Sequence, residues 1–175
     1  MNSLDHFFYP RSIAVIGASK DPGKAGYQIV RNLLDLRFSG LVYPVNPNLE
    51  NLLDLHCYPD LASIPEHVEL IVVSVPAFAV LEVFEQAAAR GDVKAAVVIA
   101  SGFSETRDPE RMELETKVMA LAEKAGIRVI GPNCVGVMNT SNHLDTTFAA
   151  GIRQIPGGMS VISQSGALGA SIMMF

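Results

Sequence analysis

Five short apolar runs, rich in Val and Ile, alternate with segments of helical periodicity along most of this chain. The runs lie at 12–16, 41–45, 69–75, 95–100 and 127–130, and the helical segments lie at 24–37, 78–90 and 109–124. Strands that are buried on both faces read as continuous apolar runs, and they belong to parallel sheets covered by helices on both sides. The pattern therefore predicts an α/β fold with a doubly wound parallel sheet. We expect the strand order 3-2-1-4-5, with the runs counted along the chain.

The first apolar run leads into a glycine-rich turn. Gly17, Gly23 and Gly26 surround the start of the first helical segment. Glycine lets a backbone approach a ligand closely, and a helix N-terminus offers unpaired N–H groups with a partial positive charge. We therefore expect a phosphate-bearing ligand at this corner. The alternative is that Gly17 and Gly26 only allow the helix to pack tightly against the strand.

Two known phosphate-binding motifs fit this turn incompletely. A Walker A loop has the form G-x4-G-K-[ST], but Gly17 lies one residue too far from Gly23 and Lys24, and Ala25 stands in place of the hydroxyl residue. The dinucleotide motif G-x-G-x-x-G lacks its second glycine, and the acid expected after the second strand is replaced by Asn46. An NAD site is therefore disfavoured but stays open as an alternative.

The segments that follow the five runs should line one crevice. In a doubly wound sheet, ligands bind at the carboxyl ends of the strands, near the point where the strand order reverses. Small residues and prolines dominate these segments, so we expect a narrow and mostly apolar groove that leads away from the glycine corner. Its expected lining is Gly17, Ser19, Asn46, Pro47, Val75, Pro76, Ala77, Ala100, Ser101, Gly102, Asn133 and Cys134.

Composition narrows the functional classes. The 175 residues carry a net charge of −5 with scattered lysines and arginines, which argues against a nucleic-acid surface. The two cysteines and four histidines are dispersed, so neither a disulfide framework nor a metal site is indicated. No apolar run is long enough to span a membrane and no signal peptide is visible, so a cytoplasmic location is expected.

The pattern changes after Val137. We expect a first domain over 1–140, a linker over 141–156 and the start of a second domain over 157–175. In the last segment, 157–163 reads as a strand, and a helix follows the turn at Gln164, Ser165 and Gly166. One strand and part of a helix cannot bury a core of their own. We therefore expect Val161, Ile162, Leu168, Ile172 and 173–175 to be exposed and to favour self-association.

Two residues could be taken for nucleophiles, but their neighbours argue against it. No Lys or Arg lies beside Cys134 to lower the pKa of its thiol, so we expect this residue to pack or to line the groove. Ser165 follows an expected strand but lacks the glycine two residues earlier that a nucleophile elbow requires.

Several stretches resemble the nucleoside-diphosphate-forming acyl-CoA synthetases, a family that includes ADP-forming acetyl-CoA synthetases and the succinyl-CoA synthetase alpha chain. The similar stretches are 8–19, 43–47, 74–77, 129–134 and 161–169, in order and over essentially the whole chain. The resemblance implies a CoA-binding, Rossmann-like first domain, followed by the beginning of a flavodoxin-like ligase domain.

The resemblance also implies roles along a bound CoA molecule. The turn from Gly17 to Gly26 would hold the diphosphate, with Ser19, Lys20 and Lys24 close by. Asn46 and Pro47 would lie toward the adenosine and the 3′-phosphate. Val75, Pro76 and Ala77 would line the adenine or the pantetheine, and 100–103 would continue the groove. Asn133 and Cys134 would lie near the thiol, and 164–166 would open a helix whose N-terminus stabilises a phosphohistidine.

Two departures limit these implications. Asn48 stands where family members often have a lysine, which affects recognition of the 3′-phosphate, and none of the four histidines matches the family's phosphohistidine. We therefore expect this chain to bind CoA without turnover of its own. Nucleotide and Mg²⁺ would bind to ligase and ATP-grasp parts, or to a beta-type subunit, beyond these residues. The alternatives are a stand-alone CoA-binding regulatory module, the sensor part of a protein acetyltransferase, and an NAD-binding protein.

Overall fold

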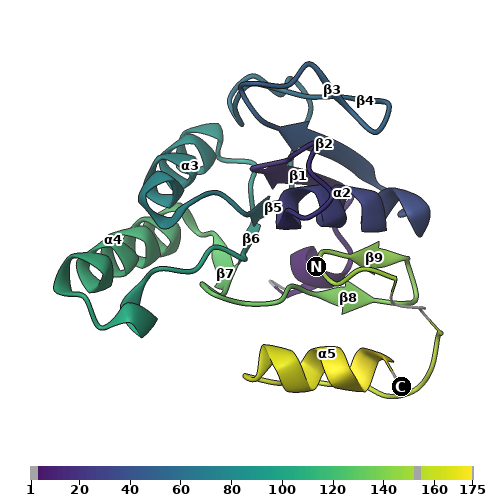
Figure 1. Ribbon diagram of the computed structural model, residues 1–175. Coiled ribbons are helices and arrows are strands. Elements are labelled where there is room, and N and C mark those ends of the chain that lie inside the picture. Colours follow the sequence, from purple (N-terminus) through teal and green to yellow (C-terminus); the bar gives the residue numbers. More distant parts are fainter. Residues whose placement is uncertain (1–3, 152–154, 175) are drawn as a thin grey trace.

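A five-stranded parallel sheet forms the centre of the computed structural model, which describes residues 4–151 and 155–174 (Figure 1). Its strands are β1 (Ser12–Ile16), β2 (Leu41–Val45), β5 (Leu70–Val73), β6 (Ala95–Val98) and β7 (Arg128–Ile130). All five lie within or at the predicted apolar runs, and the sheet is Rossmann-like. The predicted α/β class with a doubly wound parallel sheet is confirmed.

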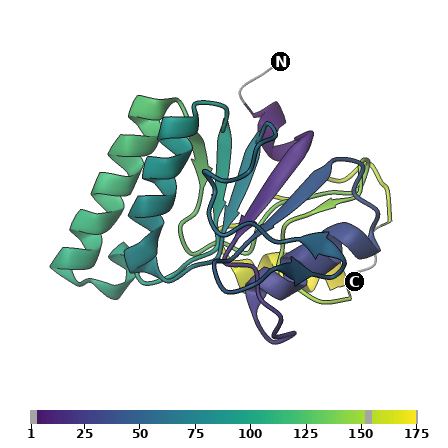
Figure 2. The same ribbon diagram turned by 90° about the horizontal axis from the view of Figure 1, so that it is seen from above.

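Helices cover both faces of the sheet, as Figure 2 shows. α2 (Ala25–Asp35) lies on one face, and α3 (Ala77–Arg90) and α4 (Pro109–Ala125) lie together on the other. Successive residues of β1 alternate between the two sides: Ile13 and Val15 pack in the α2 cluster, whereas Ala14 and Ile16 pack in the α3–α4 cluster. Because both faces are covered, the inner strands β5 and β6 are apolar at every position, and β1 is apolar at every position after Ser12.

The predicted strand order 3-2-1-4-5 is wrong. β5 pairs with β1, so the observed order is β2-β1-β5-β6-β7, which is 2-1-3-4-5 when the parallel strands are counted along the chain. The outer edge of β2 is already occupied: Tyr58 donates its N–H to Pro44 O (2.9 Å), and Asn46 donates its N–H to Tyr58 O (2.8 Å). This pairing follows the small hairpin of β3 (Asn51–Leu52) and β4 (Leu55–His56). The third parallel strand therefore forms at the other edge of β1.

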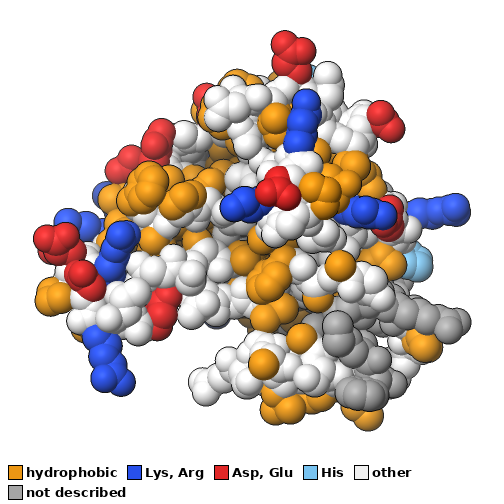
Figure 3. Space-filling view, viewed as in Figure 1, with side chains coloured by type: hydrophobic (Ala, Val, Ile, Leu, Met, Phe, Trp, Pro, Cys, Tyr) orange, Lys and Arg blue, Asp and Glu red, His pale blue; other side chains and the backbone are white. Residues whose placement is uncertain are grey.

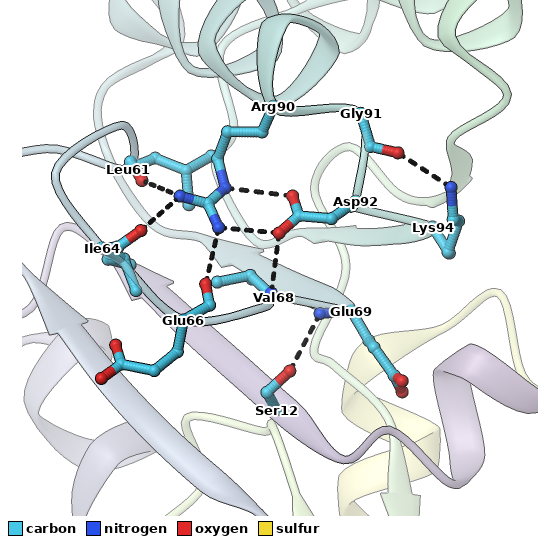
Figure 4. Close-up of polar contacts among 10 residues, drawn as sticks. All are labelled: Ser12, Leu61, Ile64, Glu66, Val68, Glu69, Arg90, Gly91, Asp92 and Lys94. Carbon is cyan, nitrogen blue, oxygen red and sulfur yellow. Dashed lines mark hydrogen bonds and ion pairs between the residues drawn. The ribbon is translucent and has the colours of Figure 1, made fainter.

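Arg90, at the end of α3, holds the connection that leads into β5 (Figure 4). Its guanidinium donates to the carbonyls of Leu61 (3.0 Å), Ile64 (2.6 Å) and Glu66 (2.7 Å). It also binds both carboxylate oxygens of Asp92, at 3.0 and 2.7 Å. One cation thus satisfies three backbone carbonyls in a segment without regular secondary structure.

A second hairpin, β8 (Met138–Asn139) and β9 (Leu144–Asp145), packs against α2. Leu144, Asp145, Thr146 and Thr147 are buried, although the sequence placed these residues in the expected linker over 141–156. The side-chain amide of Asn32 in α2 donates to the carbonyls of Thr147 and Ala149, both at 2.9 Å. Residues of the expected linker up to Ala149 therefore contact α2.

The C-terminal part differs in one respect from the expectation. α5 (Gly166–Met174) begins at the predicted turn, but 157–163 forms no strand. A strand requires a neighbour for its backbone hydrogen bonds, and no described residue pairs with this segment. The remaining helices are short, namely α1 (Asp5–Phe8) and the 3₁₀ turn η1 (Ser104–Thr106). Within the described residues, no helix has the length and apolar character needed to cross a membrane.

Candidate functional site

The strand order places the reversal point between β1 and β5, because the chain leaves β1 toward β2 on one side and returns to β5 on the other. Ligands in doubly wound folds bind at such a point, at the carboxyl ends of the strands. Ser74 bridges the two strand ends here, since its hydroxyl donates to Ile16 O (3.0 Å). The predicted site residues that follow β1 and β5 therefore lie side by side.

Both glycines of the β1 corner are required for packing. Gly17 has φ +91°, in the left-handed region, and a Cβ added to it would lie 3.0 Å from Ser74 and Val75. A Cβ on Gly26 would fall on the carbonyl of Gly17. The interpretation of Gly17 and Gly26 as packing residues is thus confirmed, and it is compatible with a ligand close to the same backbone.

The turn that precedes α2 is ordered by its own polar groups. Ser19 Oγ accepts the N–H of Asp21 (3.1 Å), and Asp21 Oδ1 accepts the N–H of Gly23 (2.8 Å). The side chains of Lys20 and Lys24 are exposed. The structure describes every residue of this turn and of α2. The side chain of Lys24, at the N-cap position, makes no capping hydrogen bond, and the first turn of α2 contains no acidic residue. The N-terminus of α2 is therefore open to an anion.

Asn46, after β2, has its side-chain amide engaged within the protein. Its Nδ2 donates to Ala18 O (2.6 Å), and its Oδ1 accepts the N–H of Asn48 (2.8 Å). Pro47 and Asn48 are exposed beside it. Asn46 thus connects the end of β2 to the turn after β1.

The residues after β5 lead directly into α3. Val75 is half-buried, Pro76 is exposed at the N-cap position, and Ala77 is buried. Pro76 makes no capping side-chain hydrogen bond, and in this described segment the first turn of α3 contains no acid. Phe78 is 74% exposed at the same rim. The edge of the sheet after β5 therefore carries apolar side chains.

The loop after β6 is held by a carboxylate that the sequence analysis missed. Glu105 accepts the N–H groups of Gly102 (2.6 Å) and Phe103 (3.0 Å). Burial opposes ionisation of this carboxyl, but these two N–H groups and that of Glu105 itself outweigh it and lower the pKa of Glu105. Gly102 has φ +101° and lies against Ala77, and Ser101 is exposed. The sequence carries no motif for this contact, because it depends on the path of the loop.

The loop after β7 joins the same edge. Asn133 is exposed and donates its backbone N–H to Ala100 O (2.9 Å), so the β6 and β7 loops are connected. Cys134 points inward, and its thiol donates to Val98 O (3.3 Å). Burial raises the pKa of Cys134, which agrees with the expected packing role and argues against a nucleophile.

The predicted turn of the second domain also reaches this edge. A Cβ on Gly166 would meet the side chain of Val135, so the first turn of α5 lies next to the β7 loop. Ser165 Oγ accepts the N–H of Leu168 (3.3 Å), which makes it a helix cap, and Gln164 is exposed. The sequence-predicted residues after all five parallel strands, and this turn, therefore share one edge of the protein.

A doubly wound sheet with a glycine corner and an open helix N-terminus at its reversal point is the arrangement of Rossmann-like nucleotide-binding domains. Comparison with protein families narrows this class. The family described as CoA binding domain matches residues 11–140. The chain belongs to this CoA-binding domain family.

Its relatives include acetyl-CoA-forming enzymes. The chain is 45% identical over 171 residues to the ADP-forming acetate–CoA ligase II of Archaeoglobus fulgidus, a match that covers 98% of this chain and 25% of that protein. It is 44% identical over 170 residues to the alpha subunit of the ADP-forming acetate–CoA ligase II of Pyrococcus furiosus, covering 97% and 36%. The chain thus spans between a quarter and somewhat more than a third of these relatives.

A solved structure agrees in fold. The dinucleotide-forming acetyl-coenzyme A synthetase 1 of Ca. Korarchaeum cryptofilum, determined with phosphate and ADP, superposes with a TM-score of 0.84 at 43% identity. The superposition covers 99% of this chain and 36% of that one. The similarity to ADP-forming acyl-CoA synthetases that the sequence motifs indicated is therefore confirmed.

Proposed function

We propose that this chain is the CoA-binding portion of an ADP-forming acyl-CoA synthetase, and that CoA binds along the carboxyl edge of the sheet. The observation that carries the proposal is the open N-terminus of α2 behind Gly17, with Lys20 and Lys24 exposed at the reversal point. This corner suits the diphosphate of CoA. The apolar rim from Val75 to Ala77 suits the less polar pantetheine arm.

In the complete enzyme, the chemistry would run through an acyl phosphate. A phosphoryl group passes between nucleotide and a histidine, the carboxylic acid becomes an acyl phosphate, and the CoA thiolate attacks its carbonyl carbon. The C–S bond forms as the C–O bond to phosphate breaks, releasing inorganic phosphate. This chain would hold CoA and present its thiol near Asn133, while the histidine, the nucleotide and Mg²⁺ would belong to other parts of the enzyme.

The C-terminal segment exposes several apolar side chains, which supports the proposal that this domain packs against a partner. Val161, Leu168 and Ile172 are 49%, 56% and 43% exposed, and Ile162 is fully exposed, whereas the side chains of 173–175 lie outside the described residues. Figure 3 shows hydrophobic side chains at the surface of the lower part of the molecule, where α5 lies. We include in the proposal that this segment packs against another part of the enzyme and, in isolation, against a second copy.

The location proposed for the protein is the cytoplasm. Cys57 and Cys134 are both free thiols, a state typical of the reducing cytoplasm. The complete enzyme proposed above would also find its nucleotide and CoA cosubstrates in the cytoplasm.

Calorimetric titration with CoA tests the proposal, with dephospho-CoA and NAD as comparators. Saturable CoA binding without NAD binding is expected. Lys24→Glu should weaken CoA binding by about tenfold or more, because it places an acid at the open end of α2. Lys117→Glu adds the same charge in the middle of α4, away from the crevice, and should leave the affinity unchanged. A folded chain that does not bind CoA would contradict the proposal.

A further inference from the structure

Asn46 occupies the position after the second strand where dinucleotide-binding folds carry an acid that binds the ribose. Here the side-chain amide is turned toward the protein instead. Nδ2 donates to Ala18 O at 2.6 Å, and Oδ1 accepts the N–H of Asn48 at 2.8 Å. One partner is an acceptor and the other a donor, so only this orientation of the amide satisfies both.

The backbone around this amide is held equally firmly. Asn46 donates its N–H to Tyr58 O (2.8 Å), which ties it to the strand-like segment at the outer edge of β2. The N–H groups of Gly17 and Ala18 both donate to Val45 O, at 3.0 and 3.2 Å. Ala18 is therefore attached to the end of β2 through its own N–H and through its carbonyl. Its side chain is fully buried.

Fixing the carbonyl of Ala18 also fixes the next amide. The Ala18–Ser19 peptide is trans, so its N–H points opposite to its carbonyl. Because the carbonyl faces Asn46, the N–H of Ser19 must point away from β2. Asn46 thus sets the direction of the first amide in the turn that leads to Lys20, Lys24 and the open end of α2.

We propose that Asn46 is a positioning residue for the diphosphate corner: its side-chain N–H orients the Ala18–Ser19 peptide for CoA and makes an acid at this position incompatible with the site. The inference rests on the proposed CoA-binding function. A carboxylate at residue 46 would place a negative oxygen against the carbonyl oxygen of Ala18. The ribose-binding acid of dinucleotide sites therefore cannot be accommodated here without turning the peptide over.

The test is Asn46→Asp, which keeps the shape and the acceptor for Asn48 but removes the donor to Ala18. At pH 7.5 the CoA affinity should fall by about tenfold relative to the unmodified chain. As the pH is lowered toward about 5, the introduced carboxyl should take up a proton, donate it to Ala18 O and restore most of the lost affinity. A residue that only supported folding would not give this recovery. NAD binding should not appear at any pH.

Two comparisons complete the experiment. Asn51→Asp adds the same charge at an exposed residue, the first of β3, and should bind CoA like the unmodified chain at each pH. Asn46→Ser removes the contact without adding charge, so its loss of affinity should not depend on pH. If circular dichroism shows that Asn46→Asp does not fold, Asn46→Ser takes its place as the test of the contact with Ala18.

The outcomes separate the inference from the function on which it rests. If the unmodified chain binds no CoA, the proposed function fails. If it binds CoA but Asn46→Asp binds equally well at pH 7.5, or its loss persists unchanged at pH 5, Asn46 is not the positioning residue. If the aspartate variant is unfolded, an unchanged affinity in Asn46→Ser overturns the inference.

Discussion

Arg90→Met should destabilise the protein substantially, because one guanidinium satisfies three backbone carbonyls and a carboxylate. Methionine keeps the apolar contacts of the arginine stem but has no donor. The carbonyls of Leu61, Ile64 and Glu66 would then lose their charged partner. Of the hydrogen bonds that described residues donate to Asp92, the one from the N–H of Val68 would remain, at 3.1 Å.

The expected loss follows from burial. The side chains of Arg90 and Asp92 are only 13% and 18% exposed. Removing one partner of a buried pair costs about 3–5 kcal/mol, and some access of water places this case at the lower end. We expect the free energy of unfolding to fall by about 3 kcal/mol. For a domain of this size, that corresponds to a decrease in Tm of roughly 6–12 °C.

Urea unfolding followed by circular dichroism measures this change. Partial burial opposes ionisation of Asp92, but Arg90 and the N–H of Val68 outweigh it and lower the pKa of Asp92. Its stabilising contribution is therefore present above the unfolded pKa and lost as the pH falls through the folded pKa, and Arg90→Met should weaken that dependence. Arg31→Met is the control, since its partner Asp35 is exposed, and should leave Tm unchanged. A loss below about 1 kcal/mol for Arg90→Met would refute the reasoning, because water would then replace the guanidinium adequately.

Three further predictions concern other parts of the chain. Burial raises the pKa of Asp145 to about 6, so ionisation of this carboxyl destabilises the folded state increasingly as the pH rises from the unfolded pKa of about 4 to the folded pKa. Asp145→Asn should therefore raise the unfolding free energy by about 1–3 kcal/mol at pH 8, with the gain vanishing below about pH 4 in urea titrations. A gain that is independent of pH would contradict this. Glu105→Ala should speed hydrogen exchange of the Gly102 and Phe103 amides by roughly tenfold, since both lose their acceptor. Unchanged exchange rates would show that the loop is stable without the Glu105 carboxylate. Light scattering should show self-association of the whole chain but not of a chain ending at residue 156, and equal monomer masses would exclude the tail as the contact.

Local elements were predictable because each depends on nearby residues. Gly91 and Gly126 end α3 and α4 in the left-handed conformation, and Asp108 caps α4 by accepting the N–H of Glu110 at 2.8 Å. The predicted helix bounds therefore agree with the structure to within two residues. The segment 157–163 was predicted wrongly because its composition favours a strand, but a strand also needs a partner to pair with.

The site was predictable only in outline. Any residue that follows a parallel strand lies at the carboxyl edge, so 17–26, 75–77 and 133–134 could be assigned there from the strand pattern. The orientation of the Asn46 amide could not, because it depends on Ala18, which is 28 residues away in the chain. The same holds for Ser74, whose hydroxyl reaches Ile16 across 58 residues.

The sequence by itself determined the α/β class, the five parallel strands and the position of the glycine corner, because apolar runs, caps and glycines act over a few residues. Tertiary structure alone decided which edge of β1 receives the third strand, since that choice depends on Tyr58 occupying the edge of β2. It also decided that the Asn46 amide faces inward and that the Cys134 thiol points to the carbonyl of Val98. These are contacts between distant segments, and their geometry exists only once the sheet has formed.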